Sequence, residues 1–361
     1  MIQANTFAVH VTYTCPLTCD HCCFSSAPTV KDRLDVDTIC RTIAQLSPEK
    51  YKLIAFTGGE PFLIGARLTE LVKFTHDLGF VTRIVTSAYW AASAQEAQRR
   101  LSPLKAAGLD ELSISWDDYH ERQTTAKVDF EHIRRAVQAC LDLDLLVAIN
   151  VVRDDASHWT AERVRGTLGL PDTERRLNVL ETPLNLTGRA KERLADSPLL
   201  AGRYLGPCPY VVTGPTLSAK NKLMACCGVI PETQDLVYDT PFVPEAVNDM
   251  VEAMERSALL SWLYLRGPYH IMEEISARHG VAIPTRDEVG GNCDACNLLF
   301  TLPGIREHIP ALVAERVDEI SDELALMDEL GLLNSAHQEG AVMNFWANKS
   351  VYGEHPSDAP A

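Results

Sequence analysis

The chain has 361 residues, of which 46% are hydrophobic, and its formal net charge at pH 7 is −16. This length predicts one large domain and a smaller one, since a single domain usually has about 100 to 200 residues. The acidic balance argues against nucleic acid or an anionic membrane as partner, because phosphate binding needs clustered Lys and Arg, and no apolar run is long enough to span a bilayer. Eleven cysteines, an odd number, and the lack of a signal segment after Met1 indicate a reducing cytoplasm.

The first half of the chain alternates β-rich runs with amphipathic helices, which predicts a parallel sheet with crossover helices. The predicted strands cover residues 7–13, 53–56, 81–86, 112–115, 145–151 and 177–180. Between them, Gly79 is expected to stop one helix, and Ser93 with Glu96 to form a capping box for another. Parallel α/β sheets bind ligands where the strands end. The polar residues at those ends are therefore candidates for cofactor binding: Thr86, Ser87, Ser115, Asp117 and Asn150.

Three cysteines follow the first predicted strand with the spacing C-x3-C-x2-C: Cys15, Cys19 and Cys22. Neighbouring cysteines on one tight loop rarely have the Cα and Cβ geometry that a disulfide needs. They can bind one face of a cubic iron–sulfur cluster, whose usual protein ligands are four cysteine thiolates. With three such ligands, one iron stays open to a non-protein ligand.

This cysteine spacing resembles that of the radical S-adenosylmethionine (radical SAM) enzymes, and Thr57-Gly58-Gly59-Glu60-Pro61 resembles the glycine-rich motif that ends their second strand. Two glycines let the backbone approach a ligand closely, while carbonyl groups there, or Glu60, could accept hydrogen bonds from an amino group. The resemblance implies a six-stranded partial (β/α)6 barrel with its active site at the C-terminal strand ends. It also implies a 4Fe–4S cluster whose open iron chelates S-adenosylmethionine (SAM), and an electron donor such as flavodoxin or ferredoxin. Reductive cleavage of SAM would then give a 5′-deoxyadenosyl radical that abstracts hydrogen from a substrate.

Other residues near this motif have two interpretations each. His21 stands where the family usually has an aromatic residue near adenine, and the alternative is a histidine that fixes the loop. Ser115 and Asp117 are placed to bind ribose hydroxyls, although Asp117 or Asp118 could instead cap the next turn. Tyr119 and His120 fit either substrate contact or packing. Arg189 fits either a carboxylate partner or an ordinary surface position.

A second group of cysteines lies beyond residue 190, where the strand–helix alternation ends: Cys208, Cys226, Cys227, Cys293 and Cys296. One cysteine, a hairpin around Lys220 to Lys222, a second cysteine and a distant C-x2-C pair resemble the auxiliary-cluster region called SPASM, or its shortened twitch form. Asn221 replaces the usual hairpin Gly, which is tolerable because Asn also adopts left-handed conformations. The resemblance implies one auxiliary 4Fe–4S cluster on Cys208, Cys226, Cys293 and Cys296, with structural zinc as the rival. The sequence does not separate Cys226 from Cys227 as ligand.

These patterns predict three regions. Residues 1–190 would form the radical SAM partial barrel, residues 191–305 the auxiliary-cluster domain, and residues 306–361 a C-terminal helix and a mobile tail. Helical patterns run over residues 243–266, 268–279 and about 309–330.

Cys23 and Cys227 are candidates for a thiol that returns a hydrogen atom to a substrate radical, as in some peptide epimerases of the superfamily. Cys40 and Cys140 lie on helical patterns and are interpreted as core residues.

Three functions remain open. The first is modification of a ribosomally synthesised peptide, by crosslink, thioether, epimerisation or oxidation. We expect a separate leader-peptide-binding protein for it, because the barrel starts within about ten residues of Met1. The second is the same chemistry on a small molecule such as a sugar, nucleotide or amino acid. The third is a non-catalytic iron–sulfur redox or scaffold protein.

Overall fold

An eight-stranded sheet organises the computed structural model, which describes residues 2–171, 173–195, 204–227 and 241–333. Across the sheet the strands are ordered β6-β5-β4-β3-β2-β1-β7-β8. Their bounds are β1 Thr6–Thr12, β2 Leu53–Gly58, β3 Val81–Thr86, β4 Glu111–Ser115, β5 Leu146–Arg153, β6 Leu177–Pro183, β7 Thr216–Leu217 and β8 Leu223–Met224. The first six strands pair in parallel and in chain order, as in an open partial barrel. All six predicted strands are confirmed, and each observed strand begins within one residue of its predicted start.

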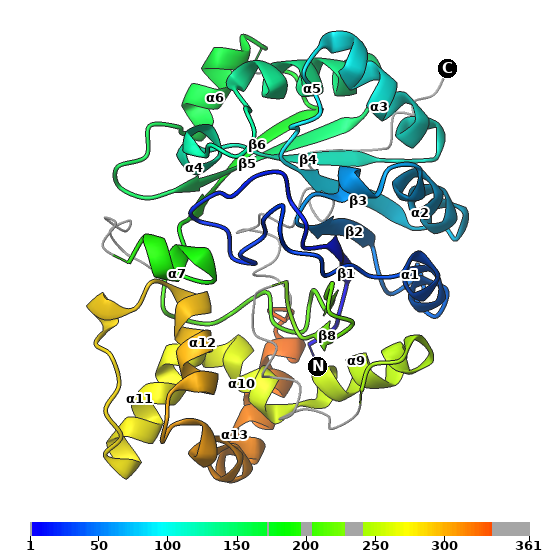
Figure 1. Cartoon of the computed structure of the whole chain (residues 1–361). Helices are drawn as coiled ribbons and strands as arrows, with labels where there is room; N and C mark the ends of the chain where they lie inside the picture. Colours follow the sequence, from blue (N-terminus) through cyan, green and yellow to red (C-terminus); the bar gives the residue numbers. More distant parts are fainter. Residues whose placement is uncertain (1, 172, 196–203, 228–240, 334–361) are drawn as a thin grey trace.

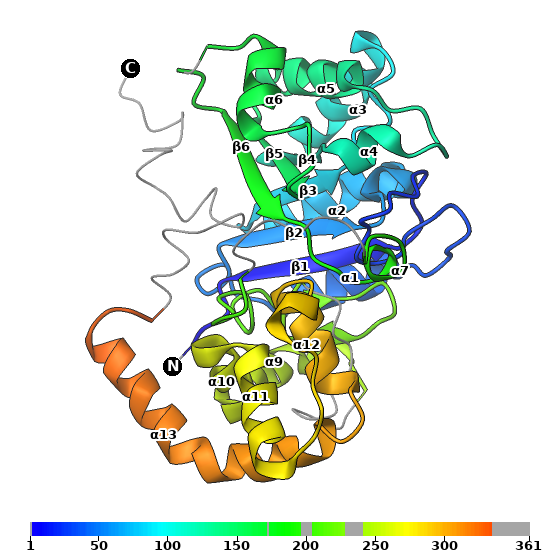
Figure 2. The same ribbon diagram turned by 90° about the vertical axis from the view of Figure 1, so that its left-hand side faces the viewer.

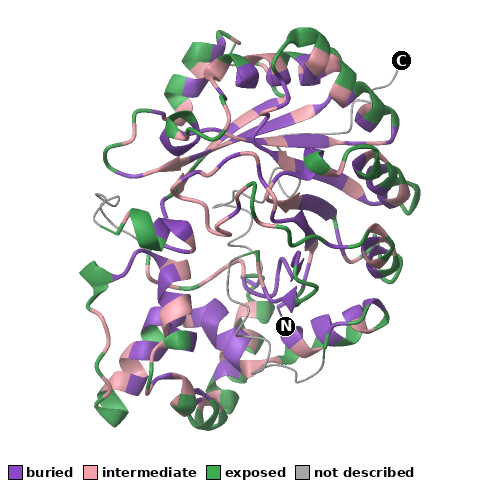
Figure 3. Cartoon of the chain, viewed as in Figure 1, coloured by how far each residue is buried: buried purple, intermediate pink, exposed green. Residues whose placement is uncertain are grey.

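Helices connect these strands and cover the outer face of the sheet, as Figure 1 shows for α1, α2, α3, α5 and α6. The helices of this part are α1 Val36–Ile43, α2 Ala66–Asp77, α3 Ala94–Ala106, α4 Asp118–Arg122, α5 Phe130–Asp142, α6 Ala161–Leu168 and α7 Arg189–Arg193. Aliphatic and aromatic side chains of the strands, such as Phe7, Ile54 and Ile84, are fully buried beneath them. Burial in Figure 3 is accordingly densest along the strands, whereas the outer surfaces of the helices are exposed. This helical layer leaves the opposite face of the sheet to the loop that follows β1.

The predicted helix ends are confirmed in part. Gly79 follows α2 with a φ of 89°, as a helix stop requires. Ser93 caps α3 by accepting a hydrogen bond from the Glu96 N–H at 3.1 Å. The reciprocal half of the predicted capping box does not form, because the Glu96 carboxylate pairs with Arg99 and Arg100 instead.

The hairpin predicted around Lys220 to Lys222 is present as β7 and β8, and Asn221 has the left-handed φ of 57° expected of it. The hairpin continues the barrel sheet: β7 lies parallel to β1, with Ala8 opposite Thr216. The backbone of the supposed second region therefore completes the first region's sheet, while the boundaries at residues 190 and 305 stay predictions.

Within the described residues, five α-helices follow the hairpin and lie below the sheet in Figures 1 and 2. They are α9 Val247–Arg256, α10 Ala258–Arg266, α11 Pro268–His279, α12 Asn292–Thr301 and α13 Ile309–Glu329. Short 3₁₀ turns cover Pro61–Ile64, Pro244–Ala246, Arg286–Glu288 and Arg306–His308.

The helical pattern over residues 243–266 is divided into two helices, because Ser257 ends α9 and caps α10 by accepting from the Leu260 N–H. The other two helical predictions are confirmed within one residue. The predicted tail lies outside the described residues from position 334 onward. Within the described part, no helix combines the length and the apolarity that crossing a bilayer demands.

The end of β1 makes a close backbone contact with Gly58 and Gly59 at the end of β2. The Gly59 N–H donates to the Thr12 carbonyl at 2.6 Å, and the Glu60 N–H donates to the Thr14 carbonyl at 3.0 Å. A Cβ added to Gly58 would collide with the Thr12 carbonyl oxygen, and a Cβ on Gly59 with that of Thr14. Both glycines are thus required by the approach of β1, in addition to any role toward a ligand.

We expect Gly58→Ala to lower the free energy of unfolding by about 2–4 kcal/mol, because the new Cβ meets backbone and the φ of 117° is strained for alanine. Gly166→Ala in α6 is the matched control. No atom lies within 4 Å of its added Cβ, so it should raise stability by about 0.5–1 kcal/mol. Urea denaturation measures both, and wild-type stability of Gly58→Ala would contradict the close contact.

Candidate active site

A cavity of about 410 Å³ lies at the C-terminal ends of the barrel strands. Its wall includes the three cysteines of the loop after β1, which is the position predicted for them. Most of the predicted strand-end residues also line it: Gly58, Gly59, Thr86, Ser87, Ser115 and Asn150. Cys227 and Cys293 reach the same cavity from the C-terminal part. Residues from both halves of the chain therefore form one chamber.

The first cysteine loop directs backbone donors at its sulfur atoms. Cys15, Cys19 and Cys22 are all free thiols. The Cys15 sulfur accepts from the Leu17 N–H at 3.4 Å, and the Cys22 sulfur accepts from the Ser26 N–H at 3.3 Å. Such donors favour the thiolate form that a metal cluster requires, so this loop fits the ligand set of a 4Fe–4S cluster. Burial raises the pKa of Cys15, and binding a cluster there must displace its proton.

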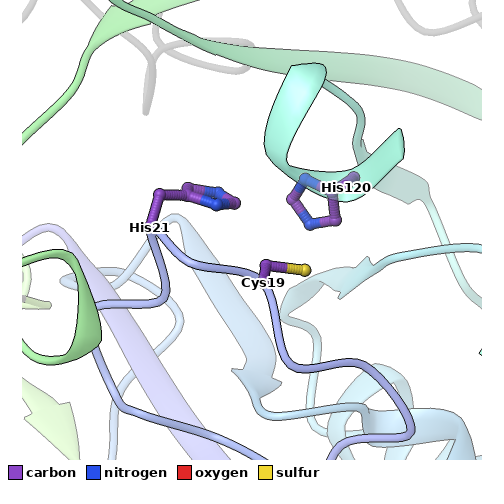
Figure 4. Close-up of side chains that lie close together, drawn as sticks. All are labelled: Cys19, His21 and His120. Carbon is purple, nitrogen blue, oxygen red and sulfur yellow. The ribbon is translucent and has the colours of Figure 1, made fainter. Parts of the chain in front are cut away.

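Cys19 has an imidazole neighbour that the sequence did not identify as such. Figure 4 shows the Cys19 side chain beneath His120, with His21 beside them, and one ligand atom of each lies within 4.8 Å of the others. His120 is hydrogen-bonded to Cys19 on one side and, through Nδ1, to Asp117 at 2.9 Å on the other. Cysteine and histidine are also zinc ligands, so this trio has the donors of a mononuclear metal site as well.

Asp117 holds this arrangement together from a fully buried position. It caps α4, because its carboxylate accepts from the backbone N–H groups of Tyr119 and His120, each at 2.9 Å. The second oxygen lies 3.5 Å from His21 Nε2. Burial alone would raise the pKa of Asp117, but the two histidines hold it well below its usual range. Of the two interpretations of Asp117, ribose binding or helix capping, the structure therefore shows the cap, and both carboxylate oxygens have partners within the protein.

His21 has the geometry of a loop-fixing residue. Its ring stacks on Tyr119 with centroids 4.8 Å apart and meets His120 edge to face at 4.9 Å. Burial lowers the pKa of His21 to about 4. Its Nδ1 is buried without a hydrogen-bond partner, and the residue also lines the cavity. A contact with adenine stays a prediction.

Glu60 was considered as an acceptor for an amino group of a ligand, but its side chain is fully buried and is hydrogen-bonded within the protein. Its carboxylate accepts from the N–H groups of Phe62 and Ser87 and from the hydroxyls of Thr86 and Ser87, at 2.7–3.2 Å. Burial raises the pKa of Glu60, against the effect of these hydrogen bonds. The backbone carbonyls of the glycine-rich motif are then the acceptors left for an amino group.

Arg189 is neither on the surface nor paired with a carboxylate in the contacts described. It is 7% exposed and donates to the carbonyl oxygens of Cys19 at 2.8 Å and Ser26 at 2.6 Å. Sequence reasoning missed this contact, because the partners are backbone atoms more than 160 positions away.

The five cysteines of the C-terminal part lie near one another. Cys293 and Cys296 are on the first turns of α12, and Asn292 donates to the Gly206 carbonyl at 2.9 Å, which brings the segment before Cys208 to that helix. Burial, and then the charges of Cys208 and Cys227, raise the pKa of Cys293 to about 12. Burial and the charge of Cys226 raise that of Cys296. All five are free thiols.

Cys23 and Cys227 both line the main cavity. Burial and the nearby thiols of Cys22, Cys293 and Cys227 raise the pKa of Cys23. Desolvation of its sulfur raises the pKa of Cys227 to about 11, although the residue as a whole is exposed. Both groups therefore carry their proton at neutral pH when no metal is bound. Cys140 is fully buried in α5, and Cys40 packs partly buried against the core, as predicted.

Residues 9–153 match the family model of the radical SAM superfamily. YydG of Bacillus subtilis, which is named for peptide biosynthesis, is 27% identical over 194 residues, covering 53% of this chain and 58% of that protein. The PqqA peptide cyclase of Bradyrhizobium diazoefficiens is 29% identical over 163 residues, covering 41% and 40%. The GTP 3′,8-cyclase of Chlorobaculum tepidum is 31% identical over 137 residues, covering 37% and 40%. The chain thus spans roughly half the length of the curated relatives it matches.

Among solved structures, anSMEcpe with bound AdoMet has a TM-score of 0.47 and 12% identity, covering 84% of this chain and 98% of that one. BtrN in complex with AdoMet and 2-DOIA has a TM-score of 0.45 and 14% identity, covering 73% and 89%. Both similarities are too low to bear on function.

We expect Glu60→Gln to lower the free energy of unfolding of the metal-free protein by about 2–3 kcal/mol, because an amide nitrogen cannot accept the hydrogen bonds of Thr86 and Ser87. Glu70→Gln, at an exposed ion pair with Arg67, should change it by less than about 0.5 kcal/mol. Chemical denaturation checks both. Equal stability of the two variants would return Glu60 to a role in ligand binding alone.

Proposed function

Because the chain carries a radical SAM domain over residues 9–153, we propose that it cleaves SAM reductively and uses the 5′-deoxyadenosyl radical to abstract hydrogen from a peptide. The observation that supports this most is the meeting of Cys15, Cys19, Cys22 and the Gly58-Gly59 backbone on one cavity. A 4Fe–4S cluster held by these three thiolates would supply the electron for SAM cleavage and keep one iron for the SAM amino and carboxylate groups.

The remaining wall of the cavity fits the demands of radical chemistry. Ser115 and Asn150 offer polar groups at adjacent strand ends, and the Asn150 side chain is oriented by the Thr182 hydroxyl at 3.4 Å. Apolar side chains such as Leu17, Phe24 and Leu184 line the same space. These would keep water from the reacting carbon while the polar groups hold the ribose.

We assign a second 4Fe–4S cluster to Cys208, Cys226, Cys293 and Cys296. Cys293 and Cys296 stand on α12, and the thiols of Cys208 and Cys226 lie close enough to raise their pKa values, which supports a common site near the start of that helix. Cys227 shares Cys208 and Cys293 as neighbours but also faces the main cavity. With four protein ligands this cluster would carry electrons, and zinc is the alternative occupant.

A peptide is the favoured substrate because two of the curated relatives are named for work on peptides. The net charge of −16 suits a basic peptide, and a leader-binding protein and a flavodoxin or ferredoxin would be the partners. The small-molecule alternative has one observation in its favour, the 31% identity to a GTP cyclase over 137 residues.

Cys23 or Cys227 would return hydrogen to the substrate in an epimerisation. The S–H bond would break as the new C–H bond forms, and the thiol would be restored by one proton and by one electron, which an auxiliary cluster could supply. Their position on the cavity wall supports this role, while crosslinking, thioether formation and oxidation would not need it.

The first test is dithionite-driven formation of 5′-deoxyadenosine from SAM by anaerobically reconstituted protein. We expect the Cys15/Cys19/Cys22→Ala variant to lose this activity completely, because the cluster has no ligands left. Cys293→Ala should keep part of the SAM cleavage, since Cys293 belongs to the second group of cysteines and Cys15, Cys19 and Cys22 are unchanged. Full cleavage by the triple variant would refute the proposed function.

Iron content separates the two adjacent cysteines. Cys226→Ala should hold about four iron atoms fewer per chain than the wild type, because it loses a ligand of the auxiliary cluster. Cys227→Ala should keep wild-type iron and SAM cleavage. The reverse pattern would exchange the two assignments, and stoichiometric zinc in the wild type would replace the auxiliary cluster.

A further inference from the structure

A short segment that follows β6 and includes the first turn of α7, residues 184–191, lies between the two groups of cysteines and is called here the strap. In both Figure 1 and Figure 2, α7 lies between the loop after β1 and α12. The strap also forms part of the cavity wall through Leu184, Asn185 and Thr187. Its contacts on either side are specific.

On one side the strap is fitted to the first cysteine loop. Gly188 has a φ of 55°, and a Cβ there would collide with the carbonyl groups of Cys22 and Cys23. The Arg189 N–H donates to the Cys22 carbonyl at 3.0 Å. Together with the side-chain contacts to Cys19 and Ser26, Arg189 thus binds three carbonyl groups of the loop that carries the proposed cluster ligands.

On the other side the strap is fixed to the start of α12. The Leu186 N–H donates to the Gly290 carbonyl at 3.2 Å, and Lys191 Nζ pairs with Asp294 at 2.6 Å. Asp294 follows Cys293 and is 3% exposed, and its other oxygen accepts from the Gly290 N–H at 2.9 Å. A continuous series of contacts therefore joins the Cys19 backbone to the helix that carries Cys293.

The charge of Arg189 has an electrostatic consequence at this position. A guanidinium group carries a positive charge that is spread over its planar fork. Its described side-chain partners are neutral carbonyl groups, whereas Arg193 on the same helix pairs with Asp20 at the surface. A buried positive charge stabilises whichever state of its surroundings is more negative, and reduction makes an iron–sulfur cluster more negative.

We propose that Arg189 is a positioning residue for the first cysteine loop and that its buried charge raises the electron affinity of the cluster bound there. This inference rests on the proposed function, since it assumes that Cys15, Cys19 and Cys22 bind the cluster. It assigns to Arg189 an effect on the electron-transfer step that precedes SAM cleavage, with no direct contact to the reacting atoms.

The positioning part is tested on the full chain without iron, by hydrogen exchange of the segment spanning residues 15–26. Arg189→Met should exchange at least about tenfold faster than wild type, because two charged hydrogen bonds to the loop are lost. Arg193→Met is the control on the same helix: its ion pair with Asp20 of this segment is exposed and contributes little, so exchange should stay within about twofold of the wild-type rate. Wild-type exchange in Arg189→Met would overturn the positioning role.

The electrostatic part is tested on reconstituted protein, by redox titration of the paramagnetic resonance signal that changes when SAM is added. In Arg189→Met the equilibrium constant for reduction should fall about tenfold, which is about 59 mV for one electron. Arg189→Lys, which keeps the charge, should stay near wild type. An unchanged potential in Arg189→Met would overturn this part.

Two outcomes are kept apart by this design. If Arg189→Met retains no iron, Arg189→Lys decides: faster exchange with a wild-type potential supports both parts, and a fall in its potential overturns the charge effect. If the wild type shows no SAM-sensitive signal at all, the proposed function fails, whereas the exchange experiment still decides the position of the loop.

Discussion

The backbone contact between the end of β1 and the Gly58-Gly59 pair fixes where everything else in the site can lie. Two N–H groups of the second strand end donate to carbonyls of the first, and no side chain fits between them. The cysteine loop therefore leaves β1 at a set height above the sheet. Because this contact is made of backbone, it depends on the absence of a Cβ more than on any particular side chain.

Three buried ionisable side chains then connect the other segments of the site to that contact. Glu60 joins the end of β2 to the end of β3, Asp117 joins α4 to the histidines beside Cys19, and Arg189 joins the cysteine loop to the strap. Each of these groups has its hydrogen bonds satisfied inside the protein, as burial of a charge demands. These three groups therefore hold the segments around the cavity through contacts within the protein, and they do not depend on a bound ligand for their hydrogen bonds.

The sequence predicted the elements that depend on local pattern and the place of the first three cysteines at the cavity, while their role as cluster ligands stays a prediction. Strand starts, the cysteine motif and the left-handed Asn221 follow from neighbouring residues alone, and the structure has them as predicted. The roles of Glu60 and Arg189 do not follow in this way, because most of their partners are backbone or hydroxyl groups brought close only by the fold. Asp117 caps α4 as one of the two interpretations predicted, but its contact with His21 also depends on the fold. An Asp with a His three residues later does mark a capped helix start, and Asp129 with His132 repeats it in α5 at a position that does not line the cavity. The pair of Asp117 and His120 belongs to the site because the fold places Cys19 beside His120.

The pairing of β7 with β1 has a consequence for how this chain can be divided. The N–H of Ala8 donates to the Pro215 carbonyl, and those of Asn5 and Thr6 to the Thr213 carbonyl, so the outer border of β1 is occupied by residues from far along the chain. A fragment ending near residue 190 would leave this border open as an unpaired strand edge, the kind of surface on which chains associate. The barrel strands and the hairpin beyond them consequently form one sheet, although the family model matches only residues 9–153.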